Sequence, residues 1–349
     1  MSENAAANTA SVRATVRQAR GPIAAIPVLE LLLLGLFAVL PLLLPDYLTI
    51  FATRVLILSL LALSFDLVWG YAGILSFGQA LFYGSAGYVV ALLARDLDIT
   101  SIFIILPAAL LVGLVLSFLM ACFLMLGRFP PSAMFIALGT LTGSYAADRL
   151  ARGWYYLGGQ NGIPSIPEMT LGSFEFDQGP IFYYLALVTL ILVYLLCRFL
   201  VRSQFGLALA GIREQETRIA FFGYRVQTIK TIVFTVAGAI AGLAGGLYTF
   251  HEGFVWPNMV GVILSTQIVL YALFGGVGTL IGPVIGVIAI ESASYALSDS
   301  FQQVWPIILG GVLLVVILLR PTGLISLIVS PEDRVGSFGR GDHAKRRRG

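Results

Sequence analysis

The chain has 349 residues, of which 58% are hydrophobic and 11% charged, with a formal net charge of +3. Soluble domains carry about 25% charged residues, so this composition excludes a soluble globular enzyme. Two cysteines and two histidines are too few for a disulfide framework or a zinc site, and we expect no metal. The only basic cluster, at 345–348, lies at the extreme C-terminus, so nothing indicates nucleic-acid binding.

Ten apolar runs follow one another along the chain, most of them near the ~20 residues that a helix needs to cross a bilayer. The first run, 22–44, follows a basic segment like that of a signal peptide, but it is too long and lacks a clear cleavage site. The others are 48–68, 74–94, 100–126, 132–151, 180–200, 230–250, 259–275, 279–297 and 304–320. The sequence therefore predicts an all-α polytopic membrane protein with about ten transmembrane helices, or eight or nine if one run is re-entrant.

The basic residues predict the orientation of these helices. If the N-terminus is inside and every run crosses, 17 of the 21 basic residues lie inside, as the positive-inside rule requires. Both termini are therefore expected in the cytoplasm. The expected organisation is a cytoplasmic tail at 1–21, a membrane domain at 22–324 and a basic cytoplasmic tail at 325–349. A long charged inner loop lies at about 201–229.

Residues 70–88 form the most unusual segment, with five glycines in 19 residues. Glycine permits close helix contacts and breaks in a helix, and irregular backbone at membrane depth must be enclosed by protein or water. One interpretation is a tightly packed helix pair that uses Gly73, Gly78 and Gly84. The other is an irregular stretch along a solute path, with a polar wall made by Ser76, Gln79 and Tyr83. The two interpretations are compatible.

A second glycine pattern lies in the seventh run. Two successive GxxxG steps are formed by Gly238, Gly242 and Gly246. This spacing places small residues on one helix face and predicts close packing against another helix.

Acidic residues inside apolar runs are energetically costly, and each is a functional candidate by default. They are Glu30, Asp66 and Glu291. We count Asp66 among the candidates for the solute path. The competing interpretation makes Asp66 and Arg54 parts of a buried polar brace. They are 12 positions apart, about 18 Å along one helix, so they cannot pair within it.

The inner loop contains a segment with helical spacing, residues 206–223, which ends at Gly223. Its polar patch includes Arg213, Glu214, Glu216 and Arg218. Glu214 and Arg218 have the i,i+4 spacing of an ion pair on one helix face. The segment is either a solvated surface helix or an amphipathic helix that docks into a cytoplasmic partner.

The chain contains no phosphate-binding GxxxxGK[ST] loop, no HExxH and no GxSxG motif, so we expect no enzymatic activity and no cofactor. Its energy source would then lie in another protein, which favours docking by segment 206–223. The rival hypothesis is an ion-coupled secondary transporter or channel that uses Glu30, Asp66 or Glu291. A membrane-embedded enzyme lacks any catalytic constellation.

Four segments in order resemble the inner-membrane permease subunits of ABC importers for branched-chain amino acids and urea. Residues 70–88 are similar to the pattern GYxGxLSxGxxxFxGxGAY, with Gln79 where histidine is common. Residues 158–162 resemble an outer TGGxNG turn, and 205–223 resemble the cytoplasmic coupling loop. The fourth match combines the glycines at 241–245 and 275–282 with the closing RPTGL at 320–324.

The resemblance implies a transport subunit that works by alternating access. It implies a second permease subunit, two cytosolic ATPase subunits that bind ATP and magnesium, a periplasmic substrate-binding protein, and a multi-pass position among the lipids of the inner membrane. Residues 206–223 would couple the permease to an ATPase subunit. Branched-chain amino acids are the favoured substrate. Urea or short-chain amides are the alternative, because segment 64–70, with Asp66, resembles the urea branch.

Overall fold

The computed structural model describes residues 25–127, 131–172, 174–301, 310–311 and 323. The predicted tails at 1–21 and 325–349 lie outside these residues, as does most of the tenth apolar run. The described helices are α2 (Ala25–Leu43), α3 (Asp46–Asp66), α4 (Gln79–Leu97), α5 (Ile102–Met125), α6 (Ala133–Gly153), α7 (Pro180–Arg202), α8 (Gln204–Phe221), α9 (Val226–Glu252), α10 (Val262–Gly275) and α11 (Ile281–Phe301).

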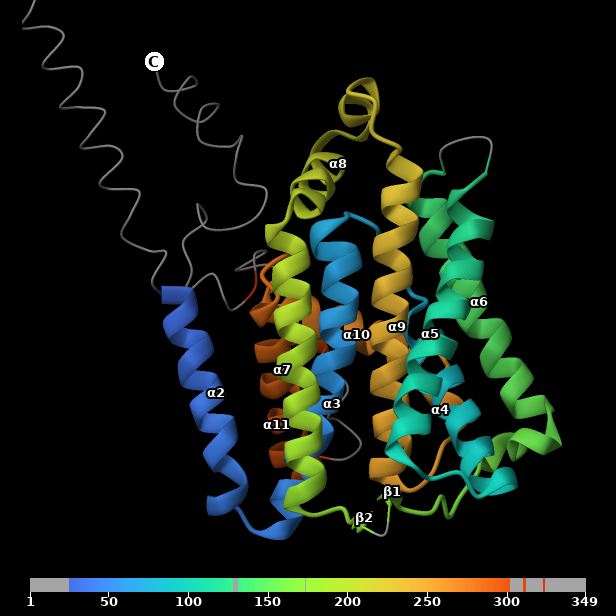
Figure 1. Cartoon of the computed structure of the whole chain (residues 1–349), viewed down its shortest axis with the longest axis vertical. Helices are drawn as coiled ribbons and strands as arrows, with labels where there is room; N and C mark the ends of the chain where they lie inside the picture. The colour runs from blue at the N-terminus through green and yellow to red at the C-terminus, as the bar shows by residue number, and fades with distance from the viewer. Residues whose placement is uncertain (1–24, 128–130, 173, 302–309, 312–322, 324–349) are drawn as a thin grey trace, which may run out of the picture.

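These helices form a bundle with two distinct ends (Figure 1). The short helix α8 lies at one end, and the two-stranded hairpin of β1 (Met169–Leu171) and β2 (Phe174–Phe176) lies at the other. The strands pair antiparallel in a fold that is otherwise helical. We call these two ends the α8 end and the hairpin end.

Four helical segments have both the length and the apolar composition of membrane spans: Asp46–Tyr71, Ile102–Met125, Pro180–Arg202 and Val226–Glu252. Most of the first and last of these is buried inside the bundle, whereas most residues of α5 and α7 are exposed or only partly buried. Their exposed side chains are large and apolar, for example Phe123 on α5 and Phe199 on α7. Such surfaces favour contact with lipid or other membrane helices over water. The chain is therefore an α-helical, multi-pass membrane protein.

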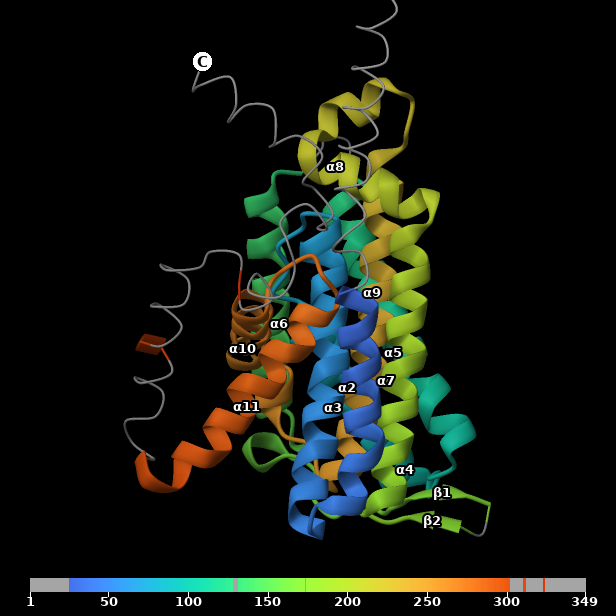
Figure 2. The same ribbon diagram turned by 90° about the vertical axis from the view of Figure 1, so that its left-hand side faces the viewer.

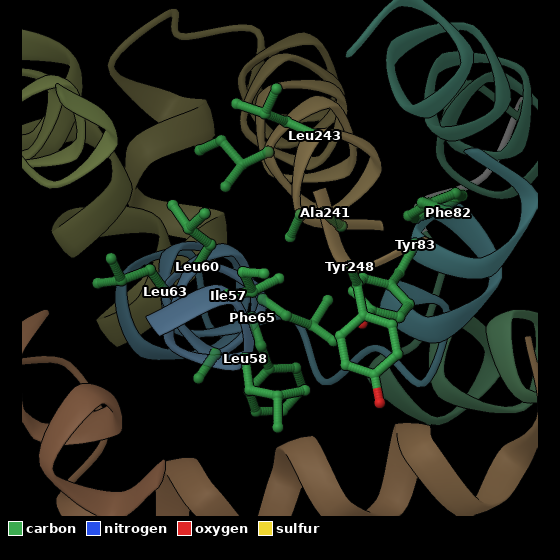
Figure 3. Close-up of a cluster of buried hydrophobic side chains, with 14 of the residues drawn as sticks. Ile57, Leu58, Leu60, Leu63, Phe65, Phe82, Tyr83, Ala241, Leu243 and Tyr248 are labelled. Carbon is green, nitrogen blue, oxygen red and sulfur yellow. The ribbon is translucent and has the colours of Figure 1, made fainter. Parts of the chain in front are cut away.

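The core lies along α3 and α9, the central pair of the bundle. Figure 3 shows Ile57 and Leu60 of α3 and Ala241 of α9 in one cluster of buried side chains, and all three are almost completely buried. Helix α9 also packs against α5 through small residues. A Cβ atom on Gly242 would lie 2.5 Å from the carbonyl oxygen of Ala109 and 2.8 Å from the Cα atom of Gly113.

Two predicted spans are shorter than expected. Helix α4 begins at Gln79, because the five residues before Gly78 are not helical. Helix α10 has 14 residues, which is about 21 Å of helix and less than the ~30 Å of a bilayer core. Helix α11 runs obliquely to the other helices (Figure 2).

Candidate functional site

The break before α4 is the centre of the candidate site. Helix α3 ends in a wider π-helical turn, Leu67–Tyr71, and Gly73 then adopts a φ of +71°, a conformation that glycine tolerates best. The backbone of Phe77 is satisfied by hydroxyl groups from other helices. Its carbonyl accepts hydrogen bonds from Ser144 and Ser265 at 2.7 Å, and its N–H donates to Thr140 at 3.0 Å. The irregular backbone inside the bundle is thus enclosed by protein, as apolar surroundings require.

Two of the predicted polar wall residues support this break. The Ser76 hydroxyl accepts a hydrogen bond from the N–H of Gly78 at 3.1 Å. The Gln79 side-chain carbonyl accepts one from Ser64 at 3.4 Å, while its buried amide nitrogen has no partner within the described ranges. Both side chains are 1% exposed. The structure therefore places Ser76 and Gln79 within packed protein.

The third wall residue, Tyr83, lines a cavity of about 170 Å³. The residues that line the cavity come from helices α3, α4 and α9 and from segment 256–267. The rings of Tyr83 and Tyr248 lie beside each other there, with centroids 5.6 Å apart (Figure 3). The lining combines polar and apolar side chains: Arg54, Leu58, Tyr83, Tyr248, Trp256, Asn258, Met259, Ile263, Leu264 and Gln267.

The structure separates Arg54 from Asp66, which the sequence analysis had placed in one polar brace. Arg54 lines the cavity, whereas Asp66, 12 positions later, is completely buried at the C-terminal end of α3. The Asp66 carboxylate accepts hydrogen bonds from the backbone N–H groups of Gly278 at 2.6 Å and Leu280 at 3.0 Å. Arg54 was not among the predicted site residues, although an arginine inside the apolar run 48–68 was a signal for it.

The other two acids of the predicted apolar runs also have protein partners. Glu30 accepts a hydrogen bond from Tyr194 at 2.6 Å and pairs with Arg198. Glu291 accepts hydrogen bonds from Gln267 at 3.1 Å and from Tyr271. These contacts connect α2 to α7 and α10 to α11.

The predicted packing glycines lie at close helix contacts or at the break. A Cβ atom on Gly84 would lie 2.7 Å from the backbone of Met259, next to the cavity. A Cβ atom on Gly78 would lie 3.3 Å from the Thr140 side chain, and a Cβ atom on Gly73 would lie 3.1 Å from the Arg213 side chain. Gly238 and Gly246 face α5, as Gly242 does.

The predicted outer turn at 158–162 lies beside the same cavity. Ile163, which follows it, exchanges backbone hydrogen bonds with Val255 at 2.8 and 3.0 Å. Val255 immediately precedes the lining residue Trp256. In this loop a hydrogen bond to the Asp96 carboxylate, 2.5 Å long, raises the pKa of the Tyr156 hydroxyl, because ionisation would break the bond and place two negative charges together.

The inner segment forms helix α8, but the helix is broken. Gln215 has φ −153° and ψ 89°, which is not helical. The predicted i,i+4 pairing of Glu214 and Arg218 is therefore wrong, because the break removes the regular helix between them. The last part of the segment turns at Gly223, which has a φ of +86°, before α9 begins.

The five predicted coupling residues divide into two groups. Arg213 donates a hydrogen bond to the Gly70 carbonyl in the π-helical turn, and Glu216 forms a 2.6 Å ion pair with Lys230 of α9. These two hold α8 against the bundle. The other three, Glu214, Arg218 and Gly223, are exposed.

Phe221 and Phe222, at the tip of this segment, were not among the predicted coupling residues. Their side chains are 92% and 78% exposed. Two adjacent exposed phenylalanines on a polar loop are unusual on a surface that faces water, and such apolar patches commonly mark contact sites. Their signal in the sequence was an aromatic pair directly before the glycine.

The chain matches the family described as "Branched-chain amino acid transport system / permease component" over residues 47–318. It is 27% identical over 303 residues to the high-affinity branched-chain amino acid transport system permease protein LivM of Salmonella typhimurium, covering 79% of this chain and 69% of the relative. It is 22% identical over 280 residues to BraD of Pseudomonas aeruginosa, a permease protein of the same description, covering 76% and 91%. No solved structure gives a significant match.

Proposed function

The chain belongs to the permease-component family of branched-chain amino acid transport systems, and from this membership we propose that it is a transmembrane subunit of an ATP-driven amino-acid importer. The observation that carries the proposal is the extent of the family match. Residues 47–318 include the broken helix, the cavity and α8. The relatives LivM and BraD are named as high-affinity branched-chain amino acid permeases, and we assign the same substrate class to this chain.

The proposal places the α8 end in the cytoplasm and the hairpin end outside the inner membrane. The predicted orientation supports this, because the basic residues of the 201–229 loop lie at the α8 end. The full chain would have about ten transmembrane helices with both termini inside. The break at 72–78 and the short α10 resemble the discontinuous helices that line substrate sites in other transporters.

In this proposal the energy comes from partner proteins. Two cytosolic ATPase subunits bind ATP and magnesium, a second permease subunit completes the path, and a periplasmic protein delivers the substrate. Helix α8 docks on an ATPase subunit through its exposed tip, Phe221 and Phe222. Nucleotide-driven motion of α8 then moves the bundle, because Arg213 and Glu216 attach α8 to the π-helical turn and to α9.

The test uses the transporter purified with its partner subunits and reconstituted in liposomes. We expect ATP-dependent uptake of leucine and none of urea. Uptake that persists without the ATPase subunits would contradict the proposal and favour an ion-coupled transporter. Uptake of urea in place of leucine would contradict the assigned substrate.

The docking surface has a matched test of its own. Replacing Phe221 and Phe222 by alanine should abolish co-purification of the ATPase subunits while insertion into the membrane is retained. Phe199→Ala removes an equally large exposed ring from the side of α7 and should leave co-purification unchanged. Equal loss in both variants would refute docking through the tip.

A further inference from the structure

We infer that Arg54 and Tyr83 form the subsite that binds the carboxylate of the transported amino acid. The inference rests on the proposed function and goes beyond it, because it names the atoms that recognise the substrate inside the permease. Both residues line the 170 Å³ cavity. They come from different helices, α3 and α4, on opposite sides of the break at 72–78.

The first observation is that both residues carry hydrogen-bond donors without a partner. The Nε atom of Arg54 and the hydroxyl of Tyr83 are buried, and neither has a hydrogen-bond partner within the part of the chain that the structure describes. Tyr83 is 1% exposed. A buried polar group without a partner is costly, and a charged one inside a membrane protein is more so. Two such groups in one cavity indicate a ligand that accepts hydrogen bonds.

The second observation is that the acidic residues around Arg54 do not neutralise it directly. Glu252 and Glu291 lie within electrostatic range of Arg54. No ion pair between Arg54 and either carboxylate occurs among the described residues, and Glu291 instead accepts hydrogen bonds from Tyr271 and Gln267. The guanidinium is therefore held near negative charge while its buried donor remains free.

The chemistry of these groups selects a carboxylate. A guanidinium presents parallel N–H donors that match the two oxygens of a carboxylate, and the Tyr83 hydroxyl adds a third donor. The negative potential of Glu252 and Glu291 suits the ammonium group of the same zwitterion. Leu58, Met259 and Leu264 supply an apolar wall for a branched side chain. A neutral solute such as urea would offer the guanidinium a single carbonyl oxygen and no negative charge.

The experiment measures equilibrium binding of tritiated leucine to the complete transporter in nanodiscs, without the binding protein. This arrangement excludes recognition of the carboxylate by the binding protein. Unlabelled leucinamide, which keeps the ammonium and side chain but lacks the carboxylate, is the competitor. The variants are Arg54→Gln, Arg54→Lys and Tyr83→Phe. Arg95→Gln is the control, because Arg95 is exposed, pairs with Asp96, and lies 12 positions beyond Tyr83 on α4, about 18 Å along the helix.

We expect Arg54→Gln to weaken leucine binding by about tenfold to a hundredfold, the range for losing a hydrogen bond to a charged group. Its preference for leucine over leucinamide should disappear, an effect that general loosening of the fold would not produce. Arg54→Lys should restore part of that preference, and Tyr83→Phe should weaken binding by about tenfold. Arg95→Gln should resemble the wild type.

Wild-type affinity and an unchanged preference in Arg54→Gln would overturn the inference. A wild-type transporter that imports leucine but shows no binding without the binding protein would overturn it as well, and would leave the proposed function intact. If Arg54→Gln does not assemble, the leucine affinity of Tyr83→Phe tests the inference, because this variant removes one oxygen and keeps the ring. Wild-type affinity in Tyr83→Phe would then overturn it. A wild-type transporter that imports no leucine refutes the proposed function itself.

Discussion

The carboxylate of Asp66 accepts a 2.6 Å hydrogen bond from the backbone N–H of Gly278, a residue 212 positions later in the chain. Its second oxygen accepts one from Leu280 at 3.0 Å. One side chain therefore fastens the end of α3 to the turn between α10 and α11. Both oxygens of Asp66 are therefore occupied by structural hydrogen bonds, whereas an ion-coupling site is expected to have a free carboxylate.

Replacing Asp66 by asparagine should lower the thermal stability of the purified transporter. Asparagine has one acceptor oxygen, so its amide group would face a backbone N–H and leave that donor unpaired, at a cost of about 1–3 kcal/mol. Thermal unfolding in detergent measures the change, and Asp177→Asn in an exposed loop is the control. Unchanged stability combined with lost uptake would assign Asp66 to transport instead.

The ion pair between Glu216 and Lys230 can be tested by exchanging the charges of the two residues. Lys230 is 6% exposed, so Glu216→Gln leaves a nearly buried ammonium without its partner, which is destabilising. We expect Glu216→Gln and Lys230→Glu each to reduce co-purification of the ATPase subunits. The double variant Glu216→Lys/Lys230→Glu should recover much of the loss. If the double variant instead loses as much co-purification as the two single variants together, the ion pair is not the cause of the loss.

Apolar runs predicted most of the helices because the bilayer imposes a length of about 20 apolar residues. The runs 48–68 and 230–250 correspond to α3 and α9. The same rule could not predict that α4 begins at Gln79. That boundary depends on hydroxyl groups of Ser144 and Ser265, which satisfy a distant backbone carbonyl and leave no trace in the local pattern.

The charged residues show the same limit at the candidate site. Sequence spacing identified Arg54 and Asp66 as unusual, since both lie in one apolar run. It could not identify their environments, because the partners of Asp66 are backbone N–H groups and the environment of Arg54 is a cavity built from three other segments. Tyr83 was predicted for the solute path and lines that cavity. Ser76 and Gln79, predicted with it, lie in packed protein.

Replacing Arg213 should uncouple ATP hydrolysis from leucine uptake. Its hydrogen bond to the Gly70 carbonyl connects α8 to the π-helical turn, so Arg213→Gln should leave ATP hydrolysis active while leucine uptake falls severalfold. The ratio of leucine transported to ATP hydrolysed measures this effect in proteoliposomes. Arg225→Gln, an exposed residue directly before α9, is the matched control. A ratio that is unchanged in Arg213→Gln would show that the contact does not transmit motion.

The Gly242→Ala variant tests how rigidly α5 is joined to α9. In Gly242→Ala the new methyl group would meet the Ala109 carbonyl at 2.5 Å and the Gly113 Cα atom at 2.8 Å. Both are backbone atoms, so relief requires the helices to separate, and overpacking of this kind costs about 1–3 kcal/mol. The thermal midpoint of the purified transporter should fall. In Gly35→Ala nothing lies within 4 Å of the new methyl group, and the better helix propensity of alanine should leave the midpoint unchanged or slightly higher. Equal midpoints in the two variants would mean that α5 moves freely against α9, and the α5–α9 contact could then no longer be treated as a fixed unit during transport.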